Sequence, residues 1–135
     1  MTYNLQGGRS FEEAVEMLFS FMGYHTRTSI VLHNRPAYIH AEMHHPKGKQ
    51  RLLIECKHCL EELVGVKEVE KFCSRIAFAR ENAEADLGLL VSNTGFSPEA
   101  VMWCARNCSF VQLKTYKQLV SRSVNIRKLL RPFHK

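Results

Sequence analysis

The run Leu-Leu-Ile-Glu-Cys-Lys at residues 52–57 constrains the fold of this chain more than any other stretch. Its apolar first half predicts a buried strand over residues 51–57. Side chains two apart on a strand point to the same face, so Glu55 and Lys57 point the same way and Cys56 points into the opposite layer. The chain must therefore fold so that a buried strand ends in a carboxylate and an ammonium group held side by side.

The other periodic patterns predict helices and strands that follow one another along the chain. Apolar spacing, with Ser10 and Ser97 as helix N-caps, gives expected helices at 10–22, 64–85, 97–106 and 115–131, and strands at 28–32, 37–43, 51–57, 86–91 and 110–113. The order α-β-β-β-α-β-α-β-α predicts an α/β fold with a mixed central sheet flanked by helices. A turn centred near Lys47 and Gly48 predicts an antiparallel hairpin that places His40 opposite Glu55.

Length and charge limit the classes of protein to consider. With 135 residues, 45% of them hydrophobic, we expect one domain over residues 1–135, with its core at about 8–119. The eight Lys and Arg residues that follow Glu99 have no acidic residue among them, and this favours a polyanionic partner. No stretch reaches the ~20 apolar residues of a membrane span, and the N-terminus lacks a signal peptide, so we expect a cytoplasmic protein without membrane contact.

A carboxylate beside a lysine suits the hydrolysis of phosphodiesters. The carboxylate can hold Mg²⁺, and the lysine can orient or deprotonate the attacking water and stabilise developing negative charge. By itself the pair Glu55 and Lys57 is a common pattern, and the alternative interpretation is an exposed pair on a strand.

The context of this pair resembles the Mrr-like branch of the restriction endonucleases, the PD-(D/E)xK superfamily. The matching pieces occur in the family's order: Gly8-Arg-Ser-Phe-Glu12 on the opening helix, Ile54-Glu-Cys-Lys57 at a strand end, and Leu89 to Ala100, "LLVSNTGFSPEA". The resemblance implies a DNA endonuclease used in DNA restriction or defence, with Mg²⁺ or alternatively Mn²⁺ as cofactor. It further implies Glu55 as a metal ligand, Lys57 as the catalytic lysine, and Glu12 as a helix glutamate near the metal, with Glu13 as the fallback.

One residue of the family pattern is missing. The family has an aspartate at the start of the strand before Glu-x-Lys, where this chain has Ala37, or Tyr38 after a shift of one residue; Asp86 is the only aspartate in the chain. Three interpretations follow: an engineered Asp-to-Ala change that inactivates a nuclease, a naturally degenerate domain that only binds DNA, or replacement of the missing acid by Glu42 or His40.

Further residues are candidates for binding. The spacing Cys56-x-x-Cys59 with Cys104-x-x-x-Cys108 suits a zinc site, although Cys56 is expected to face a packing layer and reduced, apolar cysteines are the alternative. Four histidines surround the hairpin and could contact phosphates or simply be solvated: His40, His44, His45 and His58. The residues expected to contact DNA phosphates are Lys47, Lys49, His58, Arg122, Arg127, Lys128 and Arg131.

A second hypothesis from another class is a noncatalytic DNA-binding or protein-interaction module on the same fold. If the product is a double-strand break, two sites must act on opposite strands and we expect a homodimer. The family also predicts further domains, or a sensor or recognition partner, beside such a module. RNA or a Holliday junction stays open as a substrate.

Overall fold

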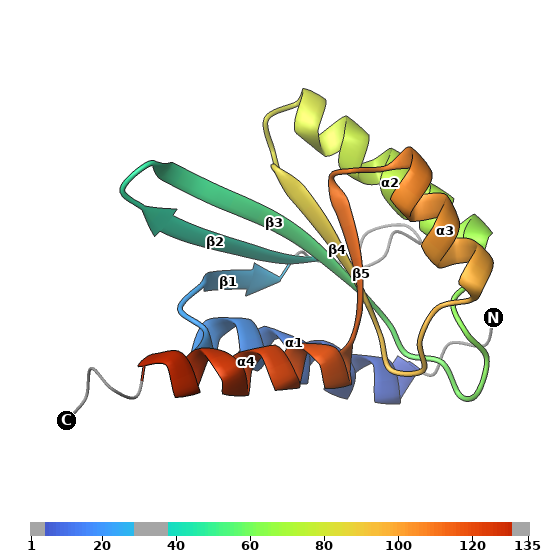
Figure 1. Cartoon of the computed structure of the whole chain (residues 1–135), viewed down its shortest axis with the longest axis horizontal. Helices are drawn as coiled ribbons and strands as arrows, with labels where there is room; N and C mark the ends of the chain where they lie inside the picture. The colour runs from blue at the N-terminus through green and yellow to red at the C-terminus, as the bar shows by residue number, and fades with distance from the viewer. Residues whose placement is uncertain (1–4, 29–37, 131–135) are drawn as a thin grey trace.

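The computed structural model describes residues 5–28 and 38–130, and the side chains of residues 10–28 and 38–123. A five-stranded mixed sheet lies at the centre, in the order β1-β2-β3-β4-β5 (Figure 1). Its strands are β1 (His25–Thr28), β2 (Ile39–His45), β3 (Gly48–Lys57), β4 (Leu87–Ser92) and β5 (Val111–Thr115). The pairs β1–β2 and β2–β3 are antiparallel, whereas β3–β4 and β4–β5 are parallel.

Helices cover both faces of this sheet. They are α1 (Leu5–Phe21), α2 (Val66–Glu81), α3 (Pro98–Asn107) and α4 (Tyr116–Leu130). Helices α1 and α4 lie beside each other on one face, and α2 and α3 lie beside each other on the other (Figure 1). The order of elements and the mixed sheet predicted from the sequence are confirmed.

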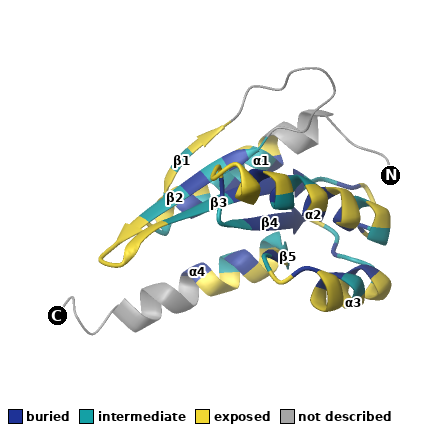
Figure 2. Cartoon of the chain, turned by 90° about the horizontal axis from the view of Figure 1, so that it is seen from above, coloured by how far each residue is buried: buried dark blue, intermediate teal, exposed yellow. Residues whose placement is uncertain are grey.

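Strand β3 is buried from both sides, and its side chains point alternately into two hydrophobic cores. Leu53 belongs to the core under α2 and α3, whereas Ile54 and Cys56 belong to the core under α1 and α4. Figure 2 shows the buried residues concentrated on the central strands. Because alternate residues face opposite layers, Glu55 and Lys57 share the face of Leu53, the face that α2 covers.

The helix ends show which local signals the sequence carries. Ser97 caps α3 as predicted, because its side chain accepts a hydrogen bond from the backbone N–H of Ala100. Helix α1 begins at Leu5 rather than at Ser10, since it runs through glycines that are weak helix formers and hide its first turn. Helix α2 ends at Glu81, earlier than expected, and Ala83 beyond it has the left-handed φ of 56°.

The hairpin of β2 and β3 forms as predicted, but its register differs. His40 pairs with Leu53 and Ile39 with Ile54, so the prediction that His40 faces Glu55 is wrong. The physical reason is the turn, which takes only the two residues Pro46 and Lys47 between His45 and Gly48. Because the turn is centred between Pro46 and Lys47, one residue earlier than predicted, every pairing along the hairpin moves by two residues. The strand expected over 28–32 lies mostly outside the described residues, and β1 precedes it.

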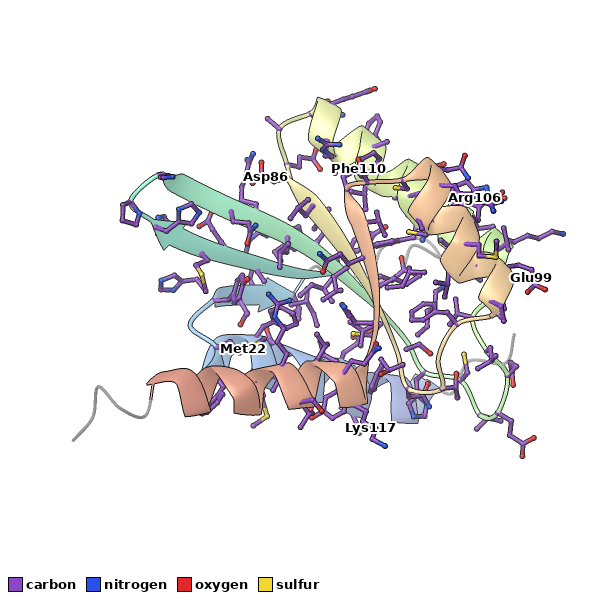
Figure 3. All side chains as sticks on the ribbon, viewed as in Figure 1. Met22, Asp86, Glu99, Arg106, Phe110 and Lys117 are labelled. Atoms are coloured by element: carbon purple, nitrogen blue, oxygen red, sulfur yellow. The ribbon has the colours of Figure 1, made fainter. Side chains whose placement is uncertain are left out.

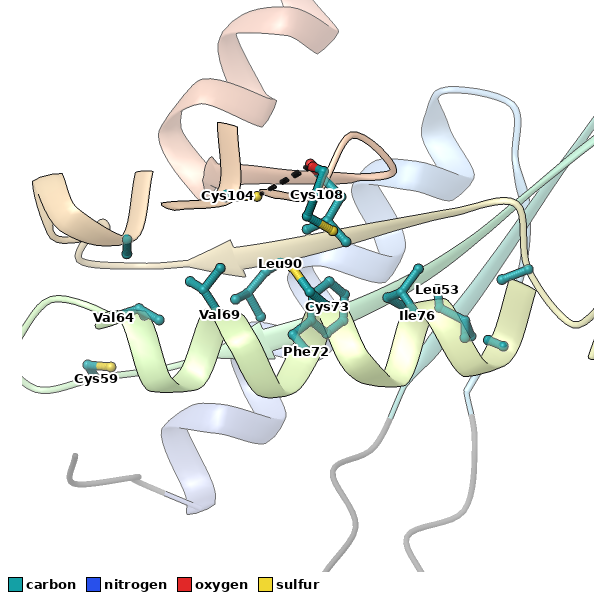
Figure 4. Packing of buried hydrophobic residues seen from close by; sticks show 14 residues of the cluster. Leu53, Cys59, Val64, Val69, Phe72, Cys73, Ile76, Leu90, Cys104 and Cys108 are labelled. Atoms are coloured by element: carbon teal, nitrogen blue, oxygen red, sulfur yellow. Dashed lines mark hydrogen bonds between the residues drawn. The ribbon is translucent and has the colours of Figure 1, made fainter. Parts of the chain in front are cut away.

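The cysteines pack as apolar side chains. All five are free and buried, and Cys56 lies on the opposite face of the sheet from Cys59, Cys104 and Cys108. Figure 4 shows Cys59 at one end of the core and Cys104 and Cys108 together near Cys73. Within residues 5–28 and 38–130 no group of His, Cys, Asp or Glu could hold a metal ion, so the zinc interpretation of the spacing is not supported. No helix among these residues has both the length and the hydropathy needed to cross a membrane.

Close packing of α2 on β4 gives a test of the fold. A Cβ at Gly88 would overlap the Cγ1 atom of Ile76 and approach its Cδ1 atom to 2.8 Å. We therefore expect Gly88→Ala to lower the free energy of unfolding by about 1–3 kcal/mol in urea titrations. The combination with Ile76→Val, which removes the Cδ1 methyl, should lose less than the sum of the single changes. Additive losses would contradict this packing.

Candidate active site

The carboxylate of Glu55 is the buried centre of the candidate site. Its side chain is 1% exposed, at the carboxyl end of β3. The Nη1 atom of Arg75 donates a hydrogen bond to its Oε1 atom at 2.8 Å, and the Nζ atom of Lys57 lies 3.0 Å from its Oε2 atom. A buried carboxylate is tolerated only where such partners replace its hydration. The predicted pair Glu55 and Lys57 is thus in direct contact.

Lys57 connects Glu55 to a second carboxylate. Its Nζ atom lies 3.2 Å from the Oε2 atom of Glu68, which comes from the first turn of α2. The exposed Lys71 approaches the other oxygen of Glu68 at 3.9 Å. Strand β3 and helix α2 together therefore hold an alternating chain of charges, from Arg75 through Glu55 and Lys57 to Glu68.

The pKa values of these groups follow from their contacts. Burial alone lowers the pKa of Lys57, but the carboxylates of Glu55 and Glu68 raise it more, so the net shift is upward. Burial raises the pKa of Glu68, and the cations of Lys57 and Lys71 outweigh that effect, so the net shift is downward. Lys57 is therefore protonated at neutral pH, a state in which it stabilises negative charge and orients water rather than accepting a proton.

Tyr38, which a shift of one residue would make the position of the predicted acid, lies beside Glu55. The register that pairs Ile39 with Ile54 puts Tyr38 next to Glu55 and on the same face, where it packs against the core under α2. Burial raises the pKa of Tyr38, the charge of Glu55 raises it further, and Arg75 and Lys57 lower it, with a net upward shift. Ala37, the predicted position of the missing aspartate, lies outside the described residues.

The other acidic candidates lie elsewhere. Glu12 is on α1, which covers the opposite face of the sheet from Glu55, and its negative charge helps to raise the pKa of the buried Cys56 thiol. Glu13 is exposed. Glu42 pairs with Arg51 in the sheet and its carboxylate contacts Lys49 at 3.6 Å, away from the site.

Asp86 is far from the site as well. Figure 3 shows it at the amino end of β4, the end opposite to the one where β3 and β4 finish. Its carboxylate accepts a hydrogen bond from the backbone N–H of Arg51 at 2.8 Å, and the guanidinium of Arg51 forms an ion pair with it. The only aspartate of the chain therefore stabilises the start of β4 and is not part of the site.

Two loops that follow β3 and β4 fix the end of β3. The side chain of Asn93 accepts from the backbone N–H of Cys59 at 2.7 Å and donates to its carbonyl at 2.8 Å. The Thr94 hydroxyl donates to the carbonyl of Glu62 at 2.7 Å. Gly95, with a φ of 119°, turns the second loop back. These contacts explain the stretch "SNTG" after β4: it holds the segment that follows Lys57.

The histidines are spread over the molecule. His44 contacts Glu42 at 3.2 Å near the hairpin turn, and His40 lines a small pocket with Arg27 and Arg51 at the edge of the sheet. His58 follows β3 directly and its ring packs on Phe11 with centroids 5.6 Å apart. The described histidines therefore form no single binding cluster.

The residues predicted to bind DNA are also separated in space. Lys47 and Lys49 lie at the hairpin turn, ~26 Å of extended strand from Lys57. Arg122 is exposed on α4, on the opposite face of the sheet from Glu55. Arg127 and Lys128 belong to the part of α4 whose side chains are not described, and Arg131 lies outside the described residues.

The described residues do not fit a divalent cation by themselves. Such a cation needs several oxygen ligands, usually with at least two carboxylates. Here Glu55 has a cation on each oxygen, and Glu68 contacts Lys57 and Lys71. A second carboxylate would have to come from a substituted residue or from outside the described part of the chain.

Arg75 and Glu68 are the site residues that the sequence interpretation missed. They lie seven residues apart on α2, which is two helical turns, so they share one face next to the apolar stripe of Val69, Phe72 and Ile76. Opposite charges at this spacing on a helix expected to cover the Glu55 strand were the available signal.

The ion pair of Lys57 and Glu68 makes stability depend on pH. Because the folded pKa of Glu68 lies below its ordinary value of 4.5, the ionised carboxylate stabilises the fold above that pH and loses this effect as pH falls. The unfolding free energy should fall between about pH 6 and about pH 3. In Glu68→Gln we expect this fall to be smaller than in the unchanged chain by about 0.5–1 kcal/mol. Glu70→Gln, on an exposed position of the same helix, is the matched control and should leave the loss unchanged. Equal curves for all three proteins would contradict the pairing.

Comparisons with known proteins agree with this fold. The sequence model of the restriction endonuclease family, Mrr catalytic domain, matches residues 5–123. No curated protein matches the chain. Among solved structures, the DNA modification-dependent restriction endonuclease AspBHI is similar with a TM-score of 0.64 and 19% identity, over 93% of this chain and 31% of that chain.

Two further solved structures share the fold. The protein of unknown function AF1548 is similar with a TM-score of 0.63 and 22% identity, over 85% of this chain and 64% of that one. The restriction endonuclease MspJI, solved in complex with a 27-mer oligonucleotide, is similar with a TM-score of 0.54 and 14% identity, over 89% of this chain and 28% of that one. The chain thus spans about a third of AspBHI and less than two thirds of AF1548. By the match of its sequence over residues 5–123, the chain belongs to the restriction endonuclease family of the Mrr catalytic domain.

Proposed function

We propose that this chain is a restriction-endonuclease domain that binds DNA and retains the Glu55–Lys57 pair, but does not cleave DNA until a second carboxylate is supplied. The observation that carries the proposal is the residue beside Glu55: it is Tyr38, whose side chain carries no carboxylate. Cleavage with a metal needs charged oxygens that converge on one cation, and Glu55 alone provides too few.

DNA as the partner is supported by the family and by charge. The related structures AspBHI and MspJI are restriction endonucleases. In this chain no acidic residue follows Glu99, so the basic residues of α4 have no acid near them in sequence. Cations of this kind bind phosphates without regard to sequence.

For a completed site we propose Mg²⁺ as the cofactor, with Mn²⁺ as a substitute, because carboxylate oxygens favour hard cations. Bound there, the metal would supply charge stabilisation at the scissile phosphate. Lys57 keeps its own role, since its protonated Nζ atom stands ready to stabilise the negative charge of the transition state.

Natural loss of the acid explains the site better than an engineered Asp-to-Ala change. The residue that the register places at Glu55 is a tyrosine, which such a change would not leave. Replacement of the acid by His40 or Glu42 is disfavoured, because these residues lie two and four positions further along the strand from Tyr38, ~7 Å or more away.

An active nuclease is the second candidate function, because Glu55 and Lys57 keep the direct contact that the chemistry requires. The second carboxylate would then come from residues outside those described or from a partner. A double-strand break would further require two copies of the chain, as a homodimer or within a longer protein.

Supercoiled plasmid tests the proposal directly. With Mg²⁺ or Mn²⁺ we expect no nicking by the unchanged chain and nicking by Tyr38→Asp, which adds a carboxylate beside Glu55. Tyr38→Phe is the matched control for the ring and should stay inactive, as should Tyr38→Asp combined with Lys57→Met. Ala37→Asp tests the other register and should nick less than Tyr38→Asp.

Each other outcome has a definite meaning. Nicking by the unchanged chain that Lys57→Met abolishes would establish the second candidate and overturn the proposal. If no variant nicks the plasmid and the chain shows no salt-sensitive binding to duplex DNA, DNA is excluded as the partner.

The position of the basic residues predicts unequal effects on DNA affinity. Lys49 already has Glu42 at 3.6 Å, whereas Arg122 is exposed on α4 in a segment without acids. We therefore expect Arg122→Gln to weaken duplex binding and to lower the slope of log affinity against log salt by about 1, measured by fluorescence anisotropy. Lys49→Gln, the control, should change the slope less. The reverse order would place the DNA at the hairpin instead.

A further inference from the structure

The site already contains fixed cations at both oxygens of its buried carboxylate. Arg75 binds the Oε1 atom of Glu55 at 2.8 Å from α2, and Lys57 approaches the Oε2 atom at 3.0 Å from β3 itself. The Glu55 side chain is 1% exposed, so these two cations are its partners in place of water. The Oε1 atom accepts a hydrogen bond from Arg75, whereas the Oε2 atom has the ion pair with Lys57 but no hydrogen bond among the described residues.

The charges of the site balance without a metal. Glu55 and Glu68 carry two negative charges, and Lys57 and Arg75 carry two positive charges, all joined by contacts of 2.8–3.2 Å. A carboxylate has free lone pairs even when paired, so occupancy of its oxygens alone would not exclude a metal. Electrostatic repulsion opposes a metal, since a divalent cation at the buried Glu55 carboxylate would lie against two positive groups.

Arg75 differs from Lys57 in what it can do at this position. Lys57 belongs to the Glu-x-Lys pattern of the strand, whereas Arg75 reaches Glu55 from a separate helix. The planar donors of a guanidinium match the geometry of a carboxylate, which the single ammonium group of a lysine does not. Arg75 is therefore a geometrically well-matched partner for Glu55 that comes from a second element.

We propose that the guanidinium of Arg75 takes the place of a divalent cation at the carboxylate of Glu55, so that this site binds neither Mg²⁺ nor Mn²⁺ in the unchanged chain. Tyr38 contributes by filling the neighbouring position with a neutral side chain. The site is then a fixed cluster of paired charges that is complete without a metal.

This inference rests on Glu55 as the centre of the proposed function, but it is tested without DNA, so its failure is distinct from a failure to bind or cleave DNA. Mn²⁺ alone is the probe. Free Mn²⁺ is measured by electron paramagnetic resonance, and thermal unfolding is followed with and without the ion.

Up to about 1 mM Mn²⁺, we expect the unchanged chain and Glu55→Gln to bind the same amount of ion, because Glu55 contributes no Mn²⁺ site in the unchanged chain. Arg75→Met should lower Tm by at least about 5 °C, because Glu55 loses a buried partner, and Mn²⁺ should restore part of that loss. Mn²⁺ should bind Tyr38→Asp combined with Arg75→Met at least about tenfold more tightly than Tyr38→Asp alone. Arg106→Met, an exposed arginine of α3, is the matched control and should show neither effect.

Two results would overturn the proposal. One is Mn²⁺ binding by the unchanged chain that is lost in Glu55→Gln, a measurement that needs no destabilised variant. The other is equal Mn²⁺ affinity of Tyr38→Asp with and without Arg75, which would mean that the guanidinium does not compete with the ion.

Discussion

The rest of the site depends on one buried negative charge, the carboxylate of Glu55 at the end of β3. A charge with 1% of its side chain exposed has to be paired, and the pairs determine which neighbouring elements can come close. Helix α2 supplies Arg75 directly and Glu68 through Lys57. The loops after β3 and β4, joined by Asn93, hold the strand end so that these contacts persist.

The site combines a contact between a carboxylate and a lysine with a neutral residue at the neighbouring position. Glu55 and Lys57, the pair that we propose for the chemistry, are in direct contact. Among the described residues, Tyr38 occupies the position beside Glu55 where we propose that an acid would complete a metal site. This is the basis of our proposal that the domain binds DNA but cleaves it only when one further acid is supplied.

Much of the fold was predictable from the sequence because its signals are local. The alternation around Glu55, the N-cap at Ser97 and the apolar stripe of α2 each act over a few residues, and each prediction was confirmed. The hairpin register was not predictable in the same way, since it depends on whether Pro46 and Lys47 alone make the turn. That shift of two residues moved Tyr38, and not His40, to the side of Glu55.

The candidate site was predicted only as far as one strand could show it. Glu55 and Lys57 lie on the same strand, so backbone geometry alone joins them. Arg75 and Glu68 reach them from α2, and although the apolar stripe of that helix indicates which face packs on the sheet, it does not indicate which residues of the strand the two charges meet. Long-range pairing of charges across elements is therefore where the sequence interpretation stopped.

The most direct measurement is a crystal structure of the unchanged chain soaked in Mn²⁺, with anomalous diffraction collected to locate the ion. We expect no anomalous peak at Glu55, and we expect the Nη1 atom of Arg75 to lie on its Oε1 atom. An anomalous peak on the Glu55 carboxylate, with Arg75 turned away from it, would contradict the proposal.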